Sequence, residues 1–404
     1  MFKNLSLKVI IFGFIFTFFS SFGQSFFLGI FNSSIRNELS ISHGQFGAIY
    51  ASATLFSSFL LIWLGKKIDD INISKFAFLV ILLLSFSCFF FSKISSVTLL
   101  FFAIFLMRFS GQGMMSHTAT TTISRYFTKS RGKALSAGWF GLSTAEFILP
   151  VLMIYLLTII DWKNIWIAIS IFVIVFLPMI SHFLVKNLNF ESREIIKKET
   201  FKEVNVKQWK RIEVIKDSRF YIICANMLAM PWIATGIFVY QSYITDSKLW
   251  STYTIPKAFM VYSITSIITL FSSGFLVDKF TSRKLIPAMN IPLLFAMIVL
   301  FYFQNEIYAY FFLGLIGVSN GLANVLGSST WAEIYGVKYI GSIRALTIAL
   351  MVFSTAFGTA VFGILIDYGF SIERIAFISG AYIIISWVLL IIFRHTLEPV
   401  KLSK

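Results

Sequence analysis

The feature that most constrains this chain is a series of long apolar stretches that recurs along its whole length. Each stretch approaches or exceeds roughly 20 residues, the length that a helix needs to cross the hydrocarbon core of a bilayer. Only 13% of the 404 residues are charged, whereas soluble proteins carry about 25%. We therefore predict an all-α integral membrane protein with twelve transmembrane helices. The predicted spans are 8–31, 44–64, 76–92, 98–123, 133–158, 165–185, 219–243, 257–277, 285–303, 308–330, 343–366 and 374–393.

A charged segment divides these spans into two sets of six. Residues 187–218 are rich in lysine, glutamate and arginine, and such a composition is typical of a water-facing connector. The sequence thus predicts an N-terminal six-helix bundle over residues 1–186, a cytoplasmic connector over 187–218, and a C-terminal six-helix bundle over 219–404.

The formal net charge of +16 is better explained by membrane topology than by nucleic-acid binding. With the N-terminus in the cytoplasm, 27 of the 34 lysine and arginine residues fall on the inner side and six on the outer side. The positive-inside rule then predicts that both termini are cytoplasmic. We expect a multi-pass protein of a bacterial cytoplasmic (inner) membrane, in contact with the lipid bilayer and with no nucleic-acid partner.

The two predicted halves share a loop pattern. The loop after the second span reads Gly65-Lys-Lys-Ile-Asp69-Asp-Ile-Asn-Ile-Ser-Lys75, and the loop after the eighth span reads Gly274-Phe-Leu-Val-Asp278-Lys-Phe-Thr-Ser-Arg-Lys284. They align without a gap, and both follow G-x-x-x-D-x-x-x-x-x-K. Six-span pseudo-repeats are typical of secondary transporters, whose substrate sites lie near the bilayer midplane between the repeats.

The 6+6 organisation, the long central segment and this loop resemble the major facilitator superfamily. The family pattern G-x-x-x-D-[RK]-x-G-x-[RK]-[RK] fits the second copy, with Thr281 where glycine is usual, and the first copy departs from it at Asp70 and Asn72. The stretch from Ser124 to Pro150 is similar to the monocarboxylate and oxalate–formate antiporter branch. The resemblance implies a rocker-switch carrier whose first, fourth, seventh and tenth helices line a central cavity.

Arg108 is the most informative residue within a span. A guanidinium inside the membrane costs several kcal/mol or more, unless it faces a wet cavity or a buried partner. Glu146 is expected at a similar depth in the next span. Arg108 could bind a substrate carboxylate bidentately, or control a coupling proton on Glu146; the alternative is a static pair that joins the two helices.

Other polar residues lie within predicted spans, where each is either a helix–helix contact or a ligand contact. The second half has no charge in mid-span to match Arg108, which favours a monoanion or a neutral solute over a dicarboxylate. The remaining candidates for substrate binding or coupling are Gln24, Gln112, Asn226, Tyr240, Asn320 and Asn324.

A second group of candidates lies at the predicted cytoplasmic ends of the helices. Glu333 ends the tenth span near several basic residues, and we interpret it as part of an inner gate. The predicted cytoplasmic gate residues are Gly65, Asp69, Arg125, Gly274, Asp278, Arg283, Glu333 and Arg344.

These observations favour a transporter over an enzyme or a channel. The sequence has no P-loop and no zinc-protease motif, so we expect no enzymatic activity, no cofactor and no metal site. The leading hypothesis is a monomeric secondary transporter of a small molecule, most simply an organic monoanion, coupled to protons or working by exchange. The alternative is a proton-coupled exporter of a hydrophobic or drug-like compound.

Overall fold

The computed structural model describes the chain except for residues 1, 69, 128–130, 186–206, 337 and 401–404. In the described part all regular structure is helical, and twelve helical segments are long and apolar enough to cross a membrane. They coincide with the twelve predicted spans, which confirms the predicted fold class. A helix satisfies its own backbone hydrogen bonds, and for that reason apolar segments of this length fold as helices in lipid. Most of the predicted connector lies outside the described residues.

The N-terminal half contains the first six crossings. Its elements are α1 (Phe2–Ser20), η1 (Ser21–Gly23), α2 (Ser25–Leu28), η2 (Gly29–Phe31), α3 (Asn32–Leu39), α4 (His43–Leu64), η3 (Gly65–Ile68), α5 (Ile73–Phe91), α6 (Val97–Met107), η4 (Arg108–Met115), α7 (Ser116–Tyr126), α8 (Arg131–Leu157) and α9 (Trp162–Val185).

The C-terminal half contains the other six crossings. Its elements are α10 (Arg211–Ile215), α11 (Ser218–Met227), α12 (Ala229–Val239), α13 (Gln241–Ser247), α14 (Thr254–Phe280), α15 (Ser282–Leu285), η5 (Ile286–Ala288), α16 (Ile291–Tyr302), α17 (Ile307–Tyr335), α18 (Ile340–Asp367), α19 (Ile372–Ile392) and η6 (Arg394–Leu397).

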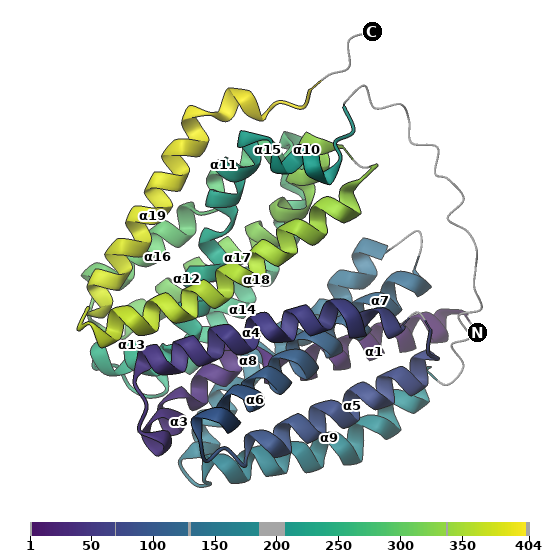
Figure 1. Ribbon diagram of the computed structural model, residues 1–404, viewed down its shortest axis with the longest axis vertical. Coiled ribbons are helices and arrows are strands. Elements are labelled where there is room, and N and C mark those ends of the chain that lie inside the picture. Colours follow the sequence, from purple (N-terminus) through teal and green to yellow (C-terminus); the bar gives the residue numbers. More distant parts are fainter. Residues whose placement is uncertain (1, 69, 128–130, 186–206, 337, 401–404) are drawn as a thin grey trace.

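The two halves are packed on the same plan. Helix α1 packs along α8 and α5 along α9 in the first half, and the equivalent crossings, α12 with α18 and α16 with α19, pack together in the second. The halves are joined mainly by α4 against α18 and by α8 against α14, with smaller contacts of α2 with α12 and of α3 with α13. In Figure 1 the purple-to-blue half lies below the green-to-yellow half, with α4 and α18 side by side along the boundary. Helices α3 and α13 lie at the end of the molecule away from the N-terminus.

The side chains on the outer faces of the bundles suit a lipid environment. Phe59, Ile62 and Trp63 on α4 are 60–64% exposed, and Phe183 on α9 is 68% exposed. Large apolar side chains at this level of exposure are favourable against acyl chains and costly against water. The exposed surface therefore agrees with the membrane assignment made from the sequence.

The two copies of the repeated loop do not have the same conformation. Helix α4 ends at Leu64 and a 3₁₀ turn follows, whereas α14 continues six residues beyond Gly274 to Phe280. The next residue, Thr281, has φ +68° and ψ 146°. A β-branched residue rarely adopts this conformation, and glycine adopts it readily. The position where the family pattern has glycine is thus the position where the backbone needs one.

Candidate functional site

The first crossing is interrupted where the sequence predicted one continuous helix. The 3₁₀ turn Ser21–Gly23 and the extended residue Gln24 (φ −84°, ψ 153°) separate α1 from α2. A Cβ atom on Gly23 would lie 2.3 Å from the carbonyl oxygen of Met107 and 2.4 Å from the backbone nitrogen of Gln112. Only glycine permits this approach, so the break in the first crossing is packed directly against the fourth crossing.

The fourth crossing changes its helical winding at the same level. Residues Arg108–Met115 form a π-helical segment between α6 and α7. Such segments are uncommon and occur frequently at functional sites, because the wider turn redirects side chains. A Cβ on Gly111 would lie 2.6 Å from the backbone nitrogen of Gly23. The first and fourth crossings therefore touch backbone to backbone at Gly23 and Gly111. The structure thus joins two irregular backbone segments beside Arg108.

The Arg108 side chain lies in this contact and is only 2% exposed. Its Nη1 donates hydrogen bonds to the carbonyl oxygen of Gly23 at 3.0 Å and to Oγ of Ser25 at 3.4 Å. The guanidinium also lies 5.4 Å from the ring centre of Tyr50, whose hydroxyl donates to Ser25 Oγ at 3.2 Å. The Nε atom of Arg108 is buried and has no hydrogen-bond partner among the described residues. The Nε edge of the guanidinium is therefore unpaired among the described residues.

Two of the predicted substrate-binding residues carry amide side chains and belong to the irregular segments beside Arg108. Gln24 occupies the break in the first crossing, and Gln112 lies in the π-helical segment opposite Gly23. Both side chains are partly exposed, and neither amide group bonds to any other part of the described chain. Together with Arg108 they supply donors of hydrogen bonds from one half of the molecule.

Glu146 does not pair with Arg108 in this structure. It lies on α8, which runs alongside α1, and Gly141 on the same helix packs against Phe14 and Thr17. Glu146 is 8% exposed and makes no ion pair within the part of the chain that is described. Its carboxyl group lies near Tyr262 on α14, across the contact between the halves. The predicted partner acid thus lies at the boundary of the two halves.

The predicted residues of the C-terminal half are distributed over several environments. Asn226 is fully buried inside its own half, where its carbonyl oxygen accepts a hydrogen bond from Nδ2 of Asn290 at 2.6 Å. Nδ2 of Asn320 donates to Ser266 Oγ at 2.9 Å, and Nδ2 of Asn324 donates to the carbonyl oxygen of Asn320 at 3.0 Å. The Asn324 side chain is exposed. These residues are not brought into contact with Arg108.

Tyr240 belongs to a different feature, a set of hydrogen bonds that joins the halves at the end of the molecule away from the N-terminus. Its hydroxyl donates to the carbonyl oxygens of His43 at 2.9 Å and Thr359 at 3.0 Å. Nδ2 of Asn32 donates to the carbonyl oxygen of Val239 at 2.7 Å, and Nε2 of Gln241 donates to that of Phe26 at 2.8 Å. The first, second, seventh and eleventh crossings therefore meet here. We call this set the distal closure.

Asp367, at the end of α18, completes the distal closure. Its carboxylate accepts hydrogen bonds from Ser42 Oγ at 2.5 Å and from the backbone nitrogens of His43 at 3.0 Å and Gly44 at 2.8 Å. These groups form the first turn of α4, where free N–H groups and the helix dipole favour a negative charge. The sequence analysis did not identify Asp367. The only signal in the sequence was the capping-box pair Ser42 and Gln45, which locates the start of α4. This pair does not show which residue of the other half binds there.

One cation lies beside the distal closure. Nε of Arg36 on α3 donates to Oδ1 of Asn32 at 2.7 Å. Burial lowers the pKa of the Arg36 guanidinium, and the nearby groups of Tyr240, Asp367 and Asp246 partly oppose this shift. Arg36 therefore orients Asn32, which makes the hydrogen bond to the other half.

The predicted gate residues lie at the opposite end, where each of the following hydrogen bonds and ion pairs joins two residues of the same half. Nε of Arg283 lies 3.1 Å from Oε1 of Glu333, and Glu333 Oε2 accepts from Ser282 N at 2.9 Å and Ser282 Oγ at 2.6 Å. Nη1 of Arg125 donates to the carbonyl oxygen of Ile68 at 3.0 Å, beside Gly65. Asp278 and Arg344 are exposed, and Gly274 has open space around it. Asp69 lies outside the described residues.

A model of the Major Facilitator Superfamily matches residues 13–260 of the chain. A bacterial homologue of the human lysosomal transporter Spinster, solved in an inward-facing and unoccupied conformation, aligns with a TM-score of 0.73 at 13% identity, covering 97% of this chain and 98% of that one. The nucleoside transporter NupG aligns with a TM-score of 0.70 at 13% identity, covering 96% and 98%. No curated protein sequence matches the chain.

Proposed function

The chain belongs to the Major Facilitator Superfamily and is a secondary transporter; from that premise we propose that its solute is a small organic monoanion. The observation that carries this proposal is the free edge of Arg108. A buried guanidinium with an unpaired Nε is costly to keep without a ligand. A carboxylate meets the fork of arginine with two parallel hydrogen bonds, so an anionic solute would satisfy it.

The surroundings of Arg108 support one negative charge rather than two. Gln24 and Gln112 are neutral donors, suited to the uncharged part of a solute. The C-terminal half has no mid-span cation to hold a second carboxylate. Asn320 and Asn324 on α17 are the neutral groups that we propose to contact the solute from the second half, and Asn226 is proposed to act through the packing of α11.

We further propose that the protein works by alternating access and that this structure is open toward the cytoplasm. The distal closure joins the halves on the side away from the N-terminus, whereas the contacts described for the opposite end stay within each half. The basic residues favour cytoplasmic termini, as expected in a bacterial inner membrane. In the opposite state the proposed cytoplasmic gate, including Asp278, Glu333 and Arg344, would close while the distal closure opens.

Proton coupling is proposed to involve Glu146. Its carboxyl group is buried at the contact between α8 and α14, with no cation paired to it in the described chain. A buried carboxylate without a partner is unfavourable, so this state of the carrier favours the protonated form. A movement that separates α8 from α14 would expose the group to water and release the proton.

The test is solute counterflow in proteoliposomes that contain the purified protein. Small monocarboxylates, dicarboxylates and lipophilic cations are compared as the trans solute, with Arg108→Lys as the test variant and the exposed Arg374→Lys as its control. We expect saturable counterflow of a monocarboxylate, lost in Arg108→Lys and kept in Arg374→Lys. Counterflow of lipophilic cations alone would instead indicate an exporter of hydrophobic compounds, and equal activity of both variants would refute bidentate recognition.

A further inference from the structure

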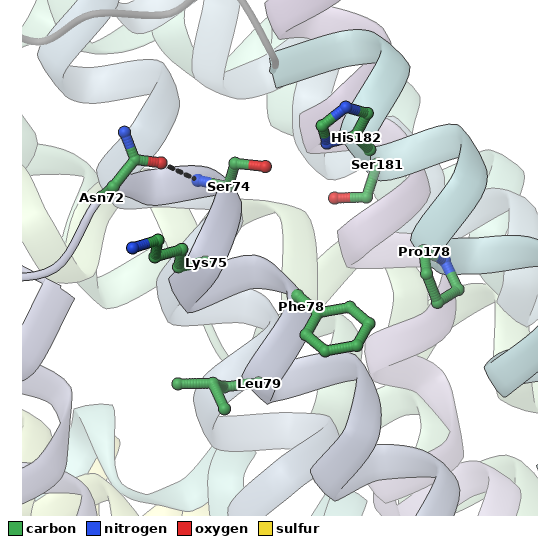
Figure 2. Close-up of a pocket in the computed structure, with 8 residues that line it drawn as sticks. All are labelled: Asn72, Ser74, Lys75, Phe78, Leu79, Pro178, Ser181 and His182. Atoms are coloured by element: carbon green, nitrogen blue, oxygen red, sulfur yellow. Dashed lines mark hydrogen bonds between the residues drawn. The ribbon is translucent and has the colours of Figure 1, made fainter.

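A groove lies on the outer flank of the N-terminal half, between the beginning of α5 and the end of α9. Its volume is about 620 Å³, and Figure 2 shows the side chains that line it. Ser74 from the first turn of α5 faces Ser181 from the last turns of α9 at this level, with His182 beside Ser181, while the side chain of Lys75 extends away from α9 (Figure 2). The groove is on the membrane side that holds the N-terminus, because Lys8 of α1 lies 4.3 Å from the ring centre of Phe183. It is remote from Arg108 and from the distal closure.

The polar end of the groove has the properties of an anion site. Helix α5 has 19 residues, and its N-cap Asn72 accepts a hydrogen bond from the backbone nitrogen of Ser74 at 2.9 Å. The first turn of such a helix offers free N–H groups and the positive end of the dipole. Lys75 and His182 are exposed, and no acidic side chain lines the groove. The lining of the groove therefore carries positive charge and no negative charge.

Ser181 supplies an independent indication of a ligand. It is only 5% exposed, and its hydroxyl group has no hydrogen-bond partner in the described chain. Figure 2 shows the hydroxyl directed from α9 toward the start of α5, where the hydroxyl of Ser74 faces it. A serine in a helix commonly bonds to a carbonyl of the preceding turn. The uncommitted Ser181 hydroxyl, at the wall of a groove, is thus a donor for a ligand.

The other end of the groove is apolar and faces the membrane. Phe78 is 46% and Leu79 is 53% exposed, and Pro178 lies on the opposite wall. A soluble anion would leave this surface bare, whereas an amphiphile would cover it and bring its charged group to the polar end. The two ends together match a molecule with an anionic head and an acyl chain.

We propose that this groove binds an anionic phospholipid, with the phosphate at the start of α5 between Ser74, Ser181 and His182, and Lys75 at the rim. An acyl chain lies along Phe78 and Pro178. With the termini in the cytoplasm the lipid comes from the cytoplasmic leaflet, which carries the anionic lipids. The proposal does not depend on which solute the protein carries.

The experiment is native mass spectrometry of the full-length protein with dioleoyl-phosphatidylglycerol and dioleoyl-phosphatidylcholine. The test variant is Ser181→Ala combined with Lys75→Gln. The matched control is Lys284→Gln, an exposed lysine at the equivalent place in the second copy of the loop. We expect the wild type and the control to bind phosphatidylglycerol at least tenfold more tightly than phosphatidylcholine. The double variant should lose this preference while it keeps its binding of phosphatidylcholine, which shows that it is folded.

Three results would overturn the proposal. The first is equal binding of the two lipids by the wild type. The second is an unchanged preference in the double variant, which would assign the lipid to another site. The third is displacement of phosphatidylglycerol by an excess of inorganic phosphate, which would make the groove a site for soluble anions.

Discussion

The carboxylate of Asp367, at the last turn of α18, accepts a hydrogen bond of 2.8 Å from the backbone nitrogen of Gly44 in the first turn of α4. The two residues belong to different halves and are 323 positions apart in the chain. The same carboxylate also accepts from Ser42 and His43. A single acidic residue of one half therefore caps a helix of the other half.

Removing the charge of Asp367 is expected to weaken the distal closure. Asp367→Asn keeps one carbonyl acceptor but loses the charge–dipole attraction, and because the site is exposed we expect a loss of about 1 kcal/mol. Such a loss changes the ratio of two carrier states roughly fivefold. Spin labels at the exposed positions Asn37 and Ser247 would report this shift between the two states as a larger population of long label-to-label distances. The control is Asp161→Asn. The carboxylate of Asp161 accepts a hydrogen bond from the backbone nitrogen of Lys163, two residues away, so this change should leave the distances between the spin labels unchanged.

The glycine contact between α4 and α18 gives a steric test of the same closure. A Cβ atom at Gly47 would lie 2.4 Å from the carbonyl oxygen of Thr359 and 2.4 Å from the Tyr240 hydroxyl. Gly47→Ala should cost about 1–3 kcal/mol in the closed arrangement and favour the opposite state. Labelling of a cysteine placed in the distal closure should become faster. Gly327→Ala, where no neighbour lies within 4 Å, should not change the rate.

Replacement of Glu146 is expected to separate proton coupling from exchange. Glu146→Gln mimics the protonated acid, so the α8–α14 contact should be retained. If Glu146 carries the coupling proton, net uptake driven by a pH gradient should stop, while exchange of internal for external solute continues and no longer depends on pH. Both rates are measured in the same proteoliposomes. A pH dependence equal to that of the wild type would show that the coupling proton binds elsewhere.

Thr281 is expected to be a site where a single change stabilises the protein. Its φ of +68° is strained for a β-branched residue and unstrained for glycine. Thr281→Gly should stabilise the folded state by about 1 kcal/mol after the added flexibility of the unfolded chain is counted, which raises Tm by roughly 2 °C. Thr252→Gly, at an exposed residue with negative φ, should lower Tm instead. A lower Tm in both variants would exclude strain at Thr281.

Several features of the fold and the site were predictable from local sequence. The twelve spans were confirmed because an apolar segment of this length has one stable form in lipid, and its own residues satisfy its backbone. The repeated loop predicted that the two halves are related. Thr281 stands where the family pattern has glycine, and the structure shows that the backbone of this residue is strained. Arg108 was identifiable because a charge inside an apolar segment is conspicuous wherever its partner lies.

The partners of these residues were not predictable in the same way. Arg108 lies against Gly23 and Ser25, and Glu146 lies near Tyr262, although their similar depth in neighbouring spans made a pair of the two possible from the sequence. The break in the first crossing and the π-helical segment in the fourth depend on the contact of Gly23 with Gly111. Neither glycine differs, in its local sequence, from glycines inside regular helices.

The sequence by itself determined that this chain crosses a membrane twelve times in two related halves, because hydrophobic length and the obligation to satisfy the backbone act within each segment. Only the tertiary structure decided which helices meet, which side of the molecule is closed, and that Asp367 caps α4. Those features arise from short-range packing and hydrogen bonds between residues hundreds of positions apart, and such contacts leave no pattern in either segment alone.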